Sequence, residues 1–227
     1  MKERISCFDI DGTLSEGLLF VPLVKSEYSS GHLSEDSFAR INEFLVAYKS
    51  GELKYEDAVE KLLSAHAEGL RGEKHQDLKV HAERFLESHE KDLFHKFGRE
   101  VIQILKSEHR LFVVTAEPQH LAEAVADMFG IQGHLSSIYA ESEGRFTGEI
   151  DRSLAHRSAK GALLQDHEIE YAFGDSEGDI DMLGCAKYPY AISPTKGLDA
   201  VAKEQNWQVF DGNDKEGIIA SIQKTLV

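Results

Sequence analysis

The chain has 227 residues, of which 41% are hydrophobic and 29% charged, and its formal net charge at pH 7 is −15. This composition is typical of a globular protein with one large domain, or a core with a smaller companion. The acidic balance excludes nucleic acid and anionic membrane surfaces as expected partners. No apolar run approaches the roughly 20 residues that span a bilayer, and the start of the chain does not resemble a secretion signal. Cys7 and Cys185 lie far apart in apolar stretches, so we expect reduced core cysteines and a cytoplasmic location.

The first predicted element is a buried strand over residues 4–8, which ends immediately before Asp9. From residue 15 to residue 92 the apolar positions recur every three or four residues, as they do at Tyr55, Val59, Leu62 and His66. Glycines and Ser-Gly pairs divide this stretch into about four helices, with no strand signal.

Beyond residue 92 the pattern changes to alternating helices and strands. A helix over residues 93–108 precedes the apolar run LFVVT (111–115), which is typical of a strand buried on both faces of a parallel sheet. The elements expected next are a helix at 118–129, a hairpin at 136–150, a helix at 157–167, a strand at 171–173, a short helix, the stretch YPYAIS (188–193), a further helix, and WQVF (207–210). This order predicts βαβ units in a doubly wound, mostly parallel α/β sheet of the Rossmann-like kind.

The simplest organisation is a discontinuous α/β core with an inserted cap. We predict a core made of residues 1–14 plus 93–227 and an α-helical cap domain made of residues 15–92. Since ligands of open parallel sheets bind outside the carboxyl ends of the strands, the inserted helices are expected to cover the binding site.

Two acidic residues mark the end of the first strand, in the stretch Asp9-Ile10-Asp11-Gly12-Thr13. Asp9 and Asp11 alternate along the chain, so both side chains point the same way. A calcium loop that began at Asp9 would require an acidic residue at its twelfth position, which is Phe20. A helix cap uses one carboxylate rather than two. The pair is therefore expected to have a chemical role.

Three further signals follow along the chain at or near strand ends. Thr115 closes LFVVT, Lys160 lies in SAKGALL, and Asp175 precedes Asp179 by four positions. Taken singly, these residues are ordinary helix caps, a surface lysine and a turn. Their order and spacing together indicate one site with carboxylates for a hard cation and donors for an anion.

With these four motifs the sequence resembles the haloacid-dehalogenase-type phosphatases, specifically the branch that contains phosphoserine phosphatase. The resemblance implies that Asp9 is the nucleophile and that Asp11 is the general acid and base. It implies that Gly12, Thr115, Ala116 and Lys160 bind the phosphate, with Lys160 also neutralising charge. It further implies an Mg²⁺ ion held by Asp9, the backbone carbonyl of Asp11 and Asp175, with Asp179 orienting the metal-bound waters or Lys160.

The function implied is Mg²⁺-dependent hydrolysis of a small phosphorylated metabolite through an aspartyl-phosphate intermediate. Phosphoserine is the alternative rather than the favoured substrate. Leu18 and Leu62 stand where that branch carries its amine-binding glutamate and its carboxylate-binding arginine. Leucine can pair with neither group. Possible substitutes are Glu16, Arg40, Arg71 and Arg84, which otherwise read as solvated charges on helix surfaces.

A phosphomutase is less favoured because enzymes of that kind with the same core usually carry smaller caps. A non-catalytic phosphate-binding protein is less favoured because the chain retains all four motifs, and binding alone does not need Asp11. Ala116-Glu117 replaces the glycines that usually follow the second motif, and Gly178 replaces an asparagine in the fourth. Four histidines lack the compact spacing of a transition-metal site, and we expect them to be solvated or at the edge of the core: His75, His81, His89 and His95. The sequence carries no signal for an oligomeric state.

Overall fold

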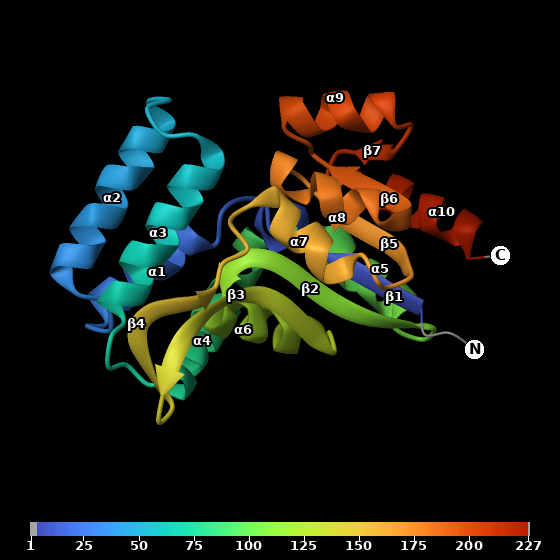
Figure 1. Cartoon of the computed structure of the whole chain (residues 1–227). Helices are drawn as coiled ribbons and strands as arrows, with labels where there is room; N and C mark the ends of the chain where they lie inside the picture. Colours follow the sequence, from blue (N-terminus) through green and yellow to red (C-terminus); the bar gives the residue numbers. More distant parts are fainter. Residues whose placement is uncertain (1–3, 227) are drawn as a thin grey trace.

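A seven-stranded sheet forms the centre of the computed structural model, which describes residues 4–226 except for the side chains of residues 91 and 92. The strand order is β4-β3-β2-β1-β5-β6-β7. Every neighbouring pair is parallel except β3 and β4, which are antiparallel. The strands are β1 (Arg4–Phe8), β2 (His109–Pro118), β3 (Gly133–Ser142), β4 (Arg145–Arg152), β5 (Ile169–Gly174), β6 (Ala186–Ile192) and β7 (Gln208–Phe210). The predicted doubly wound α/β fold is confirmed (Figure 1).

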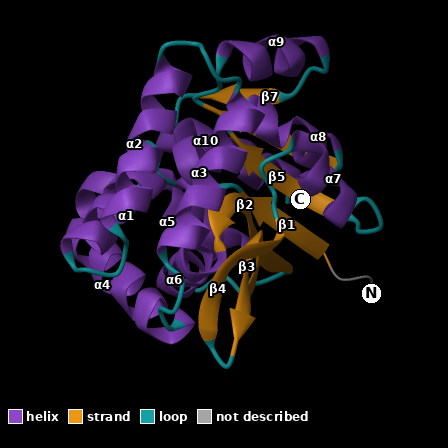
Figure 2. Cartoon of the chain, turned by 60° about the vertical axis from the view of Figure 1, so that its left-hand side comes forward, coloured by secondary structure: helices purple, strands orange, loops and turns teal. Residues whose placement is uncertain are grey.

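Helices cover both faces of this sheet (Figure 2). They are α1 (Phe20–Ser29), α2 (Glu35–Lys49), α3 (Tyr55–Gly69), α4 (His75–Leu93), α5 (Lys96–Leu105), α6 (Gln119–Phe129), α7 (Arg157–Leu164), α8 (Ile180–Gly184), α9 (Lys196–Glu204) and α10 (Lys215–Thr225). Residues of α4, α5, α6 and α10 pack in one hydrophobic cluster, and residues of α7, α8 and α9 pack in another. The two clusters are the two faces of a doubly wound sheet.

The first strand shows how the sequence builds both faces at once. Cys7 and Phe8 are each fully buried, and successive strand residues point to opposite faces. Phe8 belongs to the cluster of α5 and α6, where its ring stacks on Phe173 with the ring centroids 4.7 Å apart. Cys7 belongs to the cluster of α7 and α8. This strand has the bounds predicted from the sequence, and it carries Asp9 to the edge of the sheet.

The cap helices, α1–α4, lie between β1 and β2 in the chain and confirm the expected helical insertion (Figure 1). They share a hydrophobic cluster with the β3–β4 hairpin, in which Leu62 and Leu63 of α3 lie with Tyr139 and Phe146. Residues of α4 such as Leu86 instead pack in the cluster of α5 and α6. The cap is therefore joined to the sheet on two sides, and the domain boundaries at residues 14/15 and 92/93 stay a prediction.

A fully buried polar cluster also joins the cap helices to the rest of the fold. Glu27 of α1 lies 2.6 Å from His66 Nε2 of α3 and 3.0 Å from His120 Nε2 of α6. The other ring nitrogen of His66 is 2.9 Å from the Tyr139 hydroxyl on β3. Burial alone would raise the pKa of Glu27, but the two histidines outweigh it and hold that pKa below its usual range. We call Glu27, His66, His120 and Tyr139 the buried cluster.

The sequence analysis did not identify the buried cluster, although its signal is present. Glu27 occupies the position that continues the buried face of α1 formed by Phe20, Leu23 and Val24. An acidic residue at an apolar position of a helix requires a buried partner.

Within residues 4–226, no helix is long and apolar enough to cross a membrane. Both cysteines are free, and burial raises the pKa of the Cys7 thiol to about 12.

Candidate active site

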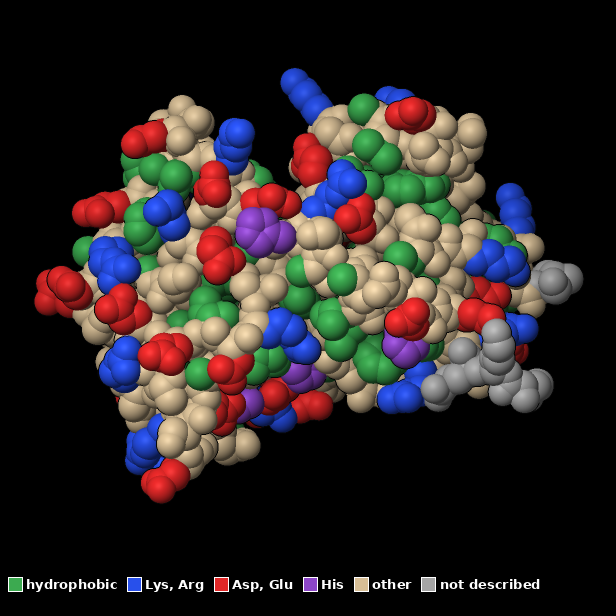
Figure 3. Space-filling view, in the orientation of Figure 1, with side chains coloured by type: hydrophobic (Ala, Val, Ile, Leu, Met, Phe, Trp, Pro, Cys, Tyr) green, Lys and Arg blue, Asp and Glu red, His purple; other side chains and the backbone are tan. Residues whose placement is uncertain are grey.

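A polar cleft lies at the carboxyl ends of β1, β2 and β5. Asp9 follows β1, Thr115 lies near the end of β2, and Asp175 follows β5. Because β1 is parallel to both neighbours, these residues meet at one edge of the sheet. Six of the eight residues predicted for the site line this cleft, and Gly12 and Asp179 are not among its described lining residues. The six are Asp9, Asp11, Thr115, Ala116, Lys160 and Asp175. Figure 3 shows the molecular surface hollowed between the lobe of α2 and α3 and the lobe that carries α9.

Lys160 joins the first and last motifs inside the cleft. Its Nζ lies 2.6 Å from Asp9 Oδ1 and 2.6 Å from Asp179 Oδ1, and all three residues are buried. Burial opposes the charge of the ammonium, but the carboxylates of Asp179 and Asp9 outweigh it and raise the pKa of Lys160. The lysine is therefore a fixed positive charge directly beside Asp9.

Asp179 uses both of its oxygens to position other groups. Oδ1 accepts from Lys160, and Oδ2 accepts from the backbone N–H groups of Asp175 and Ser176 at 3.1 and 3.2 Å. The carboxylate therefore orders the turn that follows β5 and holds the lysine in place. This geometry fits the orienting role expected for Asp179.

The carboxylates of this cleft form a suitable donor set for a hard divalent cation. Asp9, Asp175 and Asp179 each offer an oxygen atom, and the three oxygens lie within 4.8 Å of one another. Burial, together with the charge of Asp179, raises the pKa of Asp9 to about 8 and that of Asp175 to about 9. Protein carboxylates crowded in this way are destabilised unless a cation offsets them, and oxygen donors suit Mg²⁺.

Gly12 allows the first motif to approach the fourth. Its φ is +73°, and a Cβ atom at this position would lie 2.3 Å from Asp175 Oδ2. A side chain there would displace the Asp175 carboxylate, and the backbone conformation itself favours glycine. The glycine of the first motif is thus required by packing against the candidate cation site.

Asp11 and Asp9 have different hydrogen-bond partners. Its Oδ1 accepts from the backbone N–H of Leu19 at 2.7 Å. Burial raises the pKa of Asp11, and a hydrogen bond from the carboxyl group of Glu117 opposes that rise. Burial also raises the pKa of Glu117 well above its ordinary value, and the Asp11 charge adds to the effect. Asp11 and Glu117 are therefore a pair of buried carboxyl groups next to the cleft, each of which affects the pKa of the other.

Glu117 is the main functional candidate that the sequence analysis missed. It was noted as a departure from glycine, and no role was assigned to it. Its backbone N–H donates to Thr115 Oγ1 at 3.2 Å, which orders the irregular last part of β2, where the register with β3 shifts. Pro118 ends β2 and is the N-cap of α6, so it lies one residue before the helix in which it was predicted.

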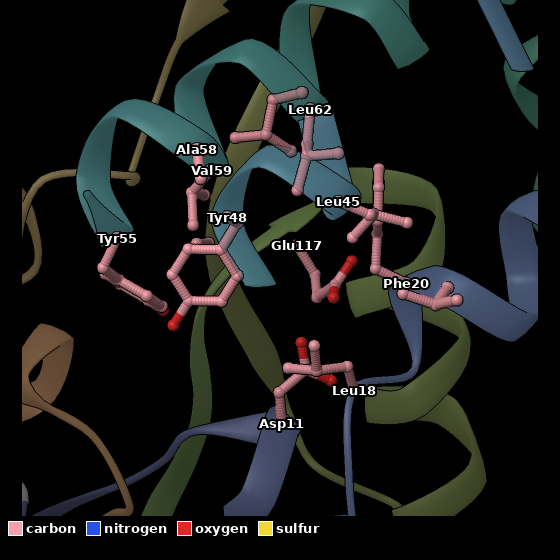
Figure 4. A pocket seen from close by; sticks show the side chains of 13 residues that line it. Asp11, Leu18, Phe20, Leu45, Tyr48, Tyr55, Ala58, Val59, Leu62 and Glu117 are labelled. Atoms are coloured by element: carbon pink, nitrogen blue, oxygen red, sulfur yellow. The ribbon is translucent and has the colours of Figure 1, made fainter. Parts of the chain in front are cut away.

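A second, apolar chamber opens beside Asp11. It is lined by cap residues, by Ala116 and by Glu117: the cap residues are Leu18, Phe20, Val21, Leu45, Tyr48, Tyr55, Ala58, Val59, Leu62 and Leu63. Figure 4 shows Glu117 and Asp11 facing this ring of hydrophobic side chains. Leu18 and Leu62, singled out from the sequence, both line it.

The charged residues considered as substitutes at the cap do not reach the site. Glu16, Arg40, Arg71 and Arg84 are absent from the described lining of both the cleft and the chamber. The basic residues that do line the cleft, besides Lys160, are Lys54 and Arg157. Arg157 Nε also lies 2.9 Å from Asp181.

Comparison with protein families places this sequence in a known group. Residues 7–184 match the family model described as haloacid dehalogenase-like hydrolase. Phosphoserine phosphatase SerB1 of Mycobacterium tuberculosis is 28% identical over 122 residues, which cover 50% of this chain and 40% of that protein. A histidinol-phosphatase of Neisseria meningitidis is 26% identical over 111 residues, which cover 44% of this chain and 50% of that protein. The alignments thus span half or less of these relatives.

Solved structures share the whole fold. A protein of unknown function from Bordetella pertussis matches with a TM-score of 0.75 and 23% identity, over 93% of this chain and 100% of that chain. A substrate-bound phosphoserine phosphatase matches with a TM-score of 0.65 and 17% identity, over 97% of this chain and 99% of that chain. At these identities the likeness concerns the fold alone.

Proposed function

The chain belongs to the haloacid dehalogenase-like hydrolases, and from this membership and the geometry of its cleft we propose that it is an Mg²⁺-dependent phosphatase of small phosphate monoesters. The observation that carries the proposal is the unequal setting of the two aspartates. Asp9 accepts a hydrogen bond from Lys160, whereas Asp11 accepts one from the Leu19 N–H and lies beside the carboxyl group of Glu117 (Figure 4). One carboxylate is thus arranged as a nucleophile and the other as a proton carrier.

In the first step, an oxygen of Asp9 attacks phosphorus and the bond to the leaving oxygen breaks. Asp11 gives its proton to that leaving oxygen, which departs as an alcohol. In the second step, water attacks the phosphorus of the aspartyl-phosphate, Asp11 takes up a proton from the water, and the bond to Asp9 breaks. Inorganic phosphate is released, and both aspartates return to their starting states.

The remaining residues bind and orient the phosphoryl group. Thr115, Ala116 and Lys160 line the cleft. In the proposed mechanism Thr115 and the backbone N–H groups near Gly12 and Ala116 donate to the phosphate oxygens, and Lys160 offsets their charge. Asp9, Asp175 and the backbone carbonyl of Asp11 would hold Mg²⁺, which supplies positive charge to the phosphate oxygens when bound. Asp179 keeps Lys160 and the turn after Gly174 in position.

Phosphoserine is the alternative substrate, supported by the name of the mycobacterial relative. Against it, Leu18 and Leu62 line the chamber that receives the leaving group, and no basic side chain lies among its described lining residues. The two free cysteines support the expected cytoplasmic location.

The test is phosphate release from a panel of phosphorylated metabolites, with Mg²⁺ and with a chelator, that includes phosphoserine and histidinol phosphate. We expect Mg²⁺-dependent release that is abolished in Asp9→Asn and strongly reduced in Asp11→Asn. Mass spectrometry of quenched turnover is expected to find the phosphoryl group on Asp9. Transfer of the phosphoryl group to a second hydroxyl would identify a mutase, and an unaltered Asp11→Asn variant would exclude the mechanism.

A further inference from the structure

The apolar chamber continues the polar cleft on the far side of Asp11. Asp11, Leu18 and Ala116 line both spaces. Lys160 and Asp175 line the cleft, so the phosphoryl group belongs there. Under the proposed function Asp11 protonates the leaving oxygen, so that oxygen lies between the two spaces and the rest of the leaving group extends into the chamber.

The chamber walls select against anionic groups. They are formed by aliphatic side chains and by the aromatic rings of Phe20, Tyr48 and Tyr55, and no Lys, Arg or His lies among the described lining residues. Leu18 is 56% exposed at the boundary with the cleft, although it is a large hydrophobic residue. A carboxylate in this chamber would meet Asp11 and Glu117 without any cation. A hydrocarbon group would instead be transferred from water to an apolar surface.

Besides Asp11, Glu117 is the acidic residue of this otherwise apolar lining. Its side chain points into the chamber beside Asp11 (Figure 4), and the residue is 4% exposed. Among the described residues, no hydrogen-bond partner reaches its buried Oε2 atom. A buried acidic group without a donor is unfavourable, and an ammonium group of a ligand would supply the missing donors.

We propose that the natural substrates are phosphate monoesters of amino alcohols with a small apolar body and no carboxylate. This proposal rests on the proposed phosphatase function. The apolar body lies among Leu45, Tyr48 and Leu62, and the ammonium group binds Glu117. Glu117 is therefore a specificity-determining residue that lies outside the four motifs.

The test uses esters that differ by one group at a time. Leucinol phosphate carries both the amine and the apolar body, isohexyl phosphate lacks the amine, ethanolamine phosphate lacks the body, and phosphoserine carries a carboxylate in its place. We expect kcat/KM for leucinol phosphate to exceed each of the other three by about tenfold or more. Equal values for leucinol and isohexyl phosphate, or phosphoserine as the best substrate, would overturn the proposal.

The Glu117→Gln variant separates substrate recognition from an effect on Asp11. If Glu117 binds the amine, the variant loses most of the preference for leucinol phosphate over isohexyl phosphate, mainly through KM. If Glu117 acts through Asp11 alone, kcat falls equally for both esters, the preference stays, and the proposal is wrong. Glu177→Gln is the matched control, because Glu177 lines the opposite, polar side of the cleft and bonds to Thr195. It is expected to keep the preference. Circular dichroism shows whether each variant is folded.

Hydrolysis of p-nitrophenyl phosphate tells the two failures apart. If this general ester is cleaved in an Asp9-dependent way while the order of the panel is wrong, the inference about the leaving group fails and the phosphatase function stands. If neither this ester nor any member of the panel is cleaved, the proposed function itself fails.

Discussion

Removing the carboxylate of Glu27 tests whether the buried cluster holds the cap helices to the sheet. Glu27→Ala deletes the hydrogen bonds at 2.6 Å to His66 and 3.0 Å to His120, and it leaves both ring nitrogens buried without this acceptor. Hydrogen bonds with a charged partner contribute about 1.5–3 kcal/mol each, and breaking a buried charged pair costs about 3–5 kcal/mol. We therefore expect the free energy of unfolding to fall by about 3–5 kcal/mol.

Glu27→Gln separates the charge from the hydrogen bonds. A glutamine can accept from His120 Nε2 and donate to His66 Nε2, while His66 Nδ1 donates to Tyr139, so both ring nitrogens that contact Glu27 keep a partner. Its cost is expected to be smaller, about 1–2 kcal/mol. For a chain of this length, the Ala variant should lower the Tm by roughly 6–20 °C.

The assay is thermal and denaturant unfolding followed by circular dichroism. Glu68→Ala is the matched control, because Glu68 lies on the same helix as His66 and pairs with Arg40 at the surface. Exposed pairs contribute about 1 kcal/mol or less. A Glu27→Ala variant no less stable than Glu68→Ala would refute the idea that the buried cluster holds the cap.

Three further outcomes follow from the same contacts. Gly12→Ala should displace Asp175 and lower both kcat and the apparent Mg²⁺ affinity, measured by phosphate release. Gly130→Ala is its control. Gly130 also has a positive φ (+66°), but among the described residues nothing beyond its chain neighbours lies within 4 Å of a Cβ added there. This variant should lose stability and keep activity. Lys160→Met should lower kcat by about a thousandfold. The control is Lys203→Met, which breaks the exposed pair with Asp199 and should leave kcat unchanged. Equal kcat values in the two variants would contradict the role of Lys160. Burial lowers the pKa of His120 from 6.5, so the unfolded state takes up the proton first and the Tm should fall as the pH drops below 6.5. This decline should be shallower in His120→Gln, and parallel curves would assign the pH dependence to other groups.

The residues at strand ends could be predicted from the sequence because local pattern and sheet geometry determine their positions together. A strand that ends at Phe8 places Asp9 at the edge of the sheet, and parallel pairing with β2 and β5 brings Thr115 and Asp175 to the same edge. No long-range contact had to be guessed individually. The helical insertion was predictable for a similar reason, since its periodicity is continuous between β1 and β2.

Contacts between elements far apart in the chain could not be predicted in this way. Glu27 meets His120 across 93 positions, and periodicity indicates that each side chain is buried without indicating its partner. The hairpin was predicted, but its packing against α3 through Tyr139 and Phe146 depends on how the cap folds back over the sheet. The role of Glu117 likewise depends on the cap, which excludes water from its carboxyl group.

The buried cluster and the apolar chamber are two parts of one interface. The helix that carries Glu27 begins at Phe20, which lines the chamber, and the helix that carries His120 begins just after Glu117. The charge of Glu27 is also among the influences that raise the pKa of Glu117. Phe20 and Glu117 thus lie at the starts of the two helices that the buried cluster joins. The shape of the chamber beside Asp11 therefore depends on packing remote from the phosphate. We therefore expect selection of the leaving group to depend on the interface between cap and sheet, and the proposed phosphoryl chemistry to depend on the strand ends.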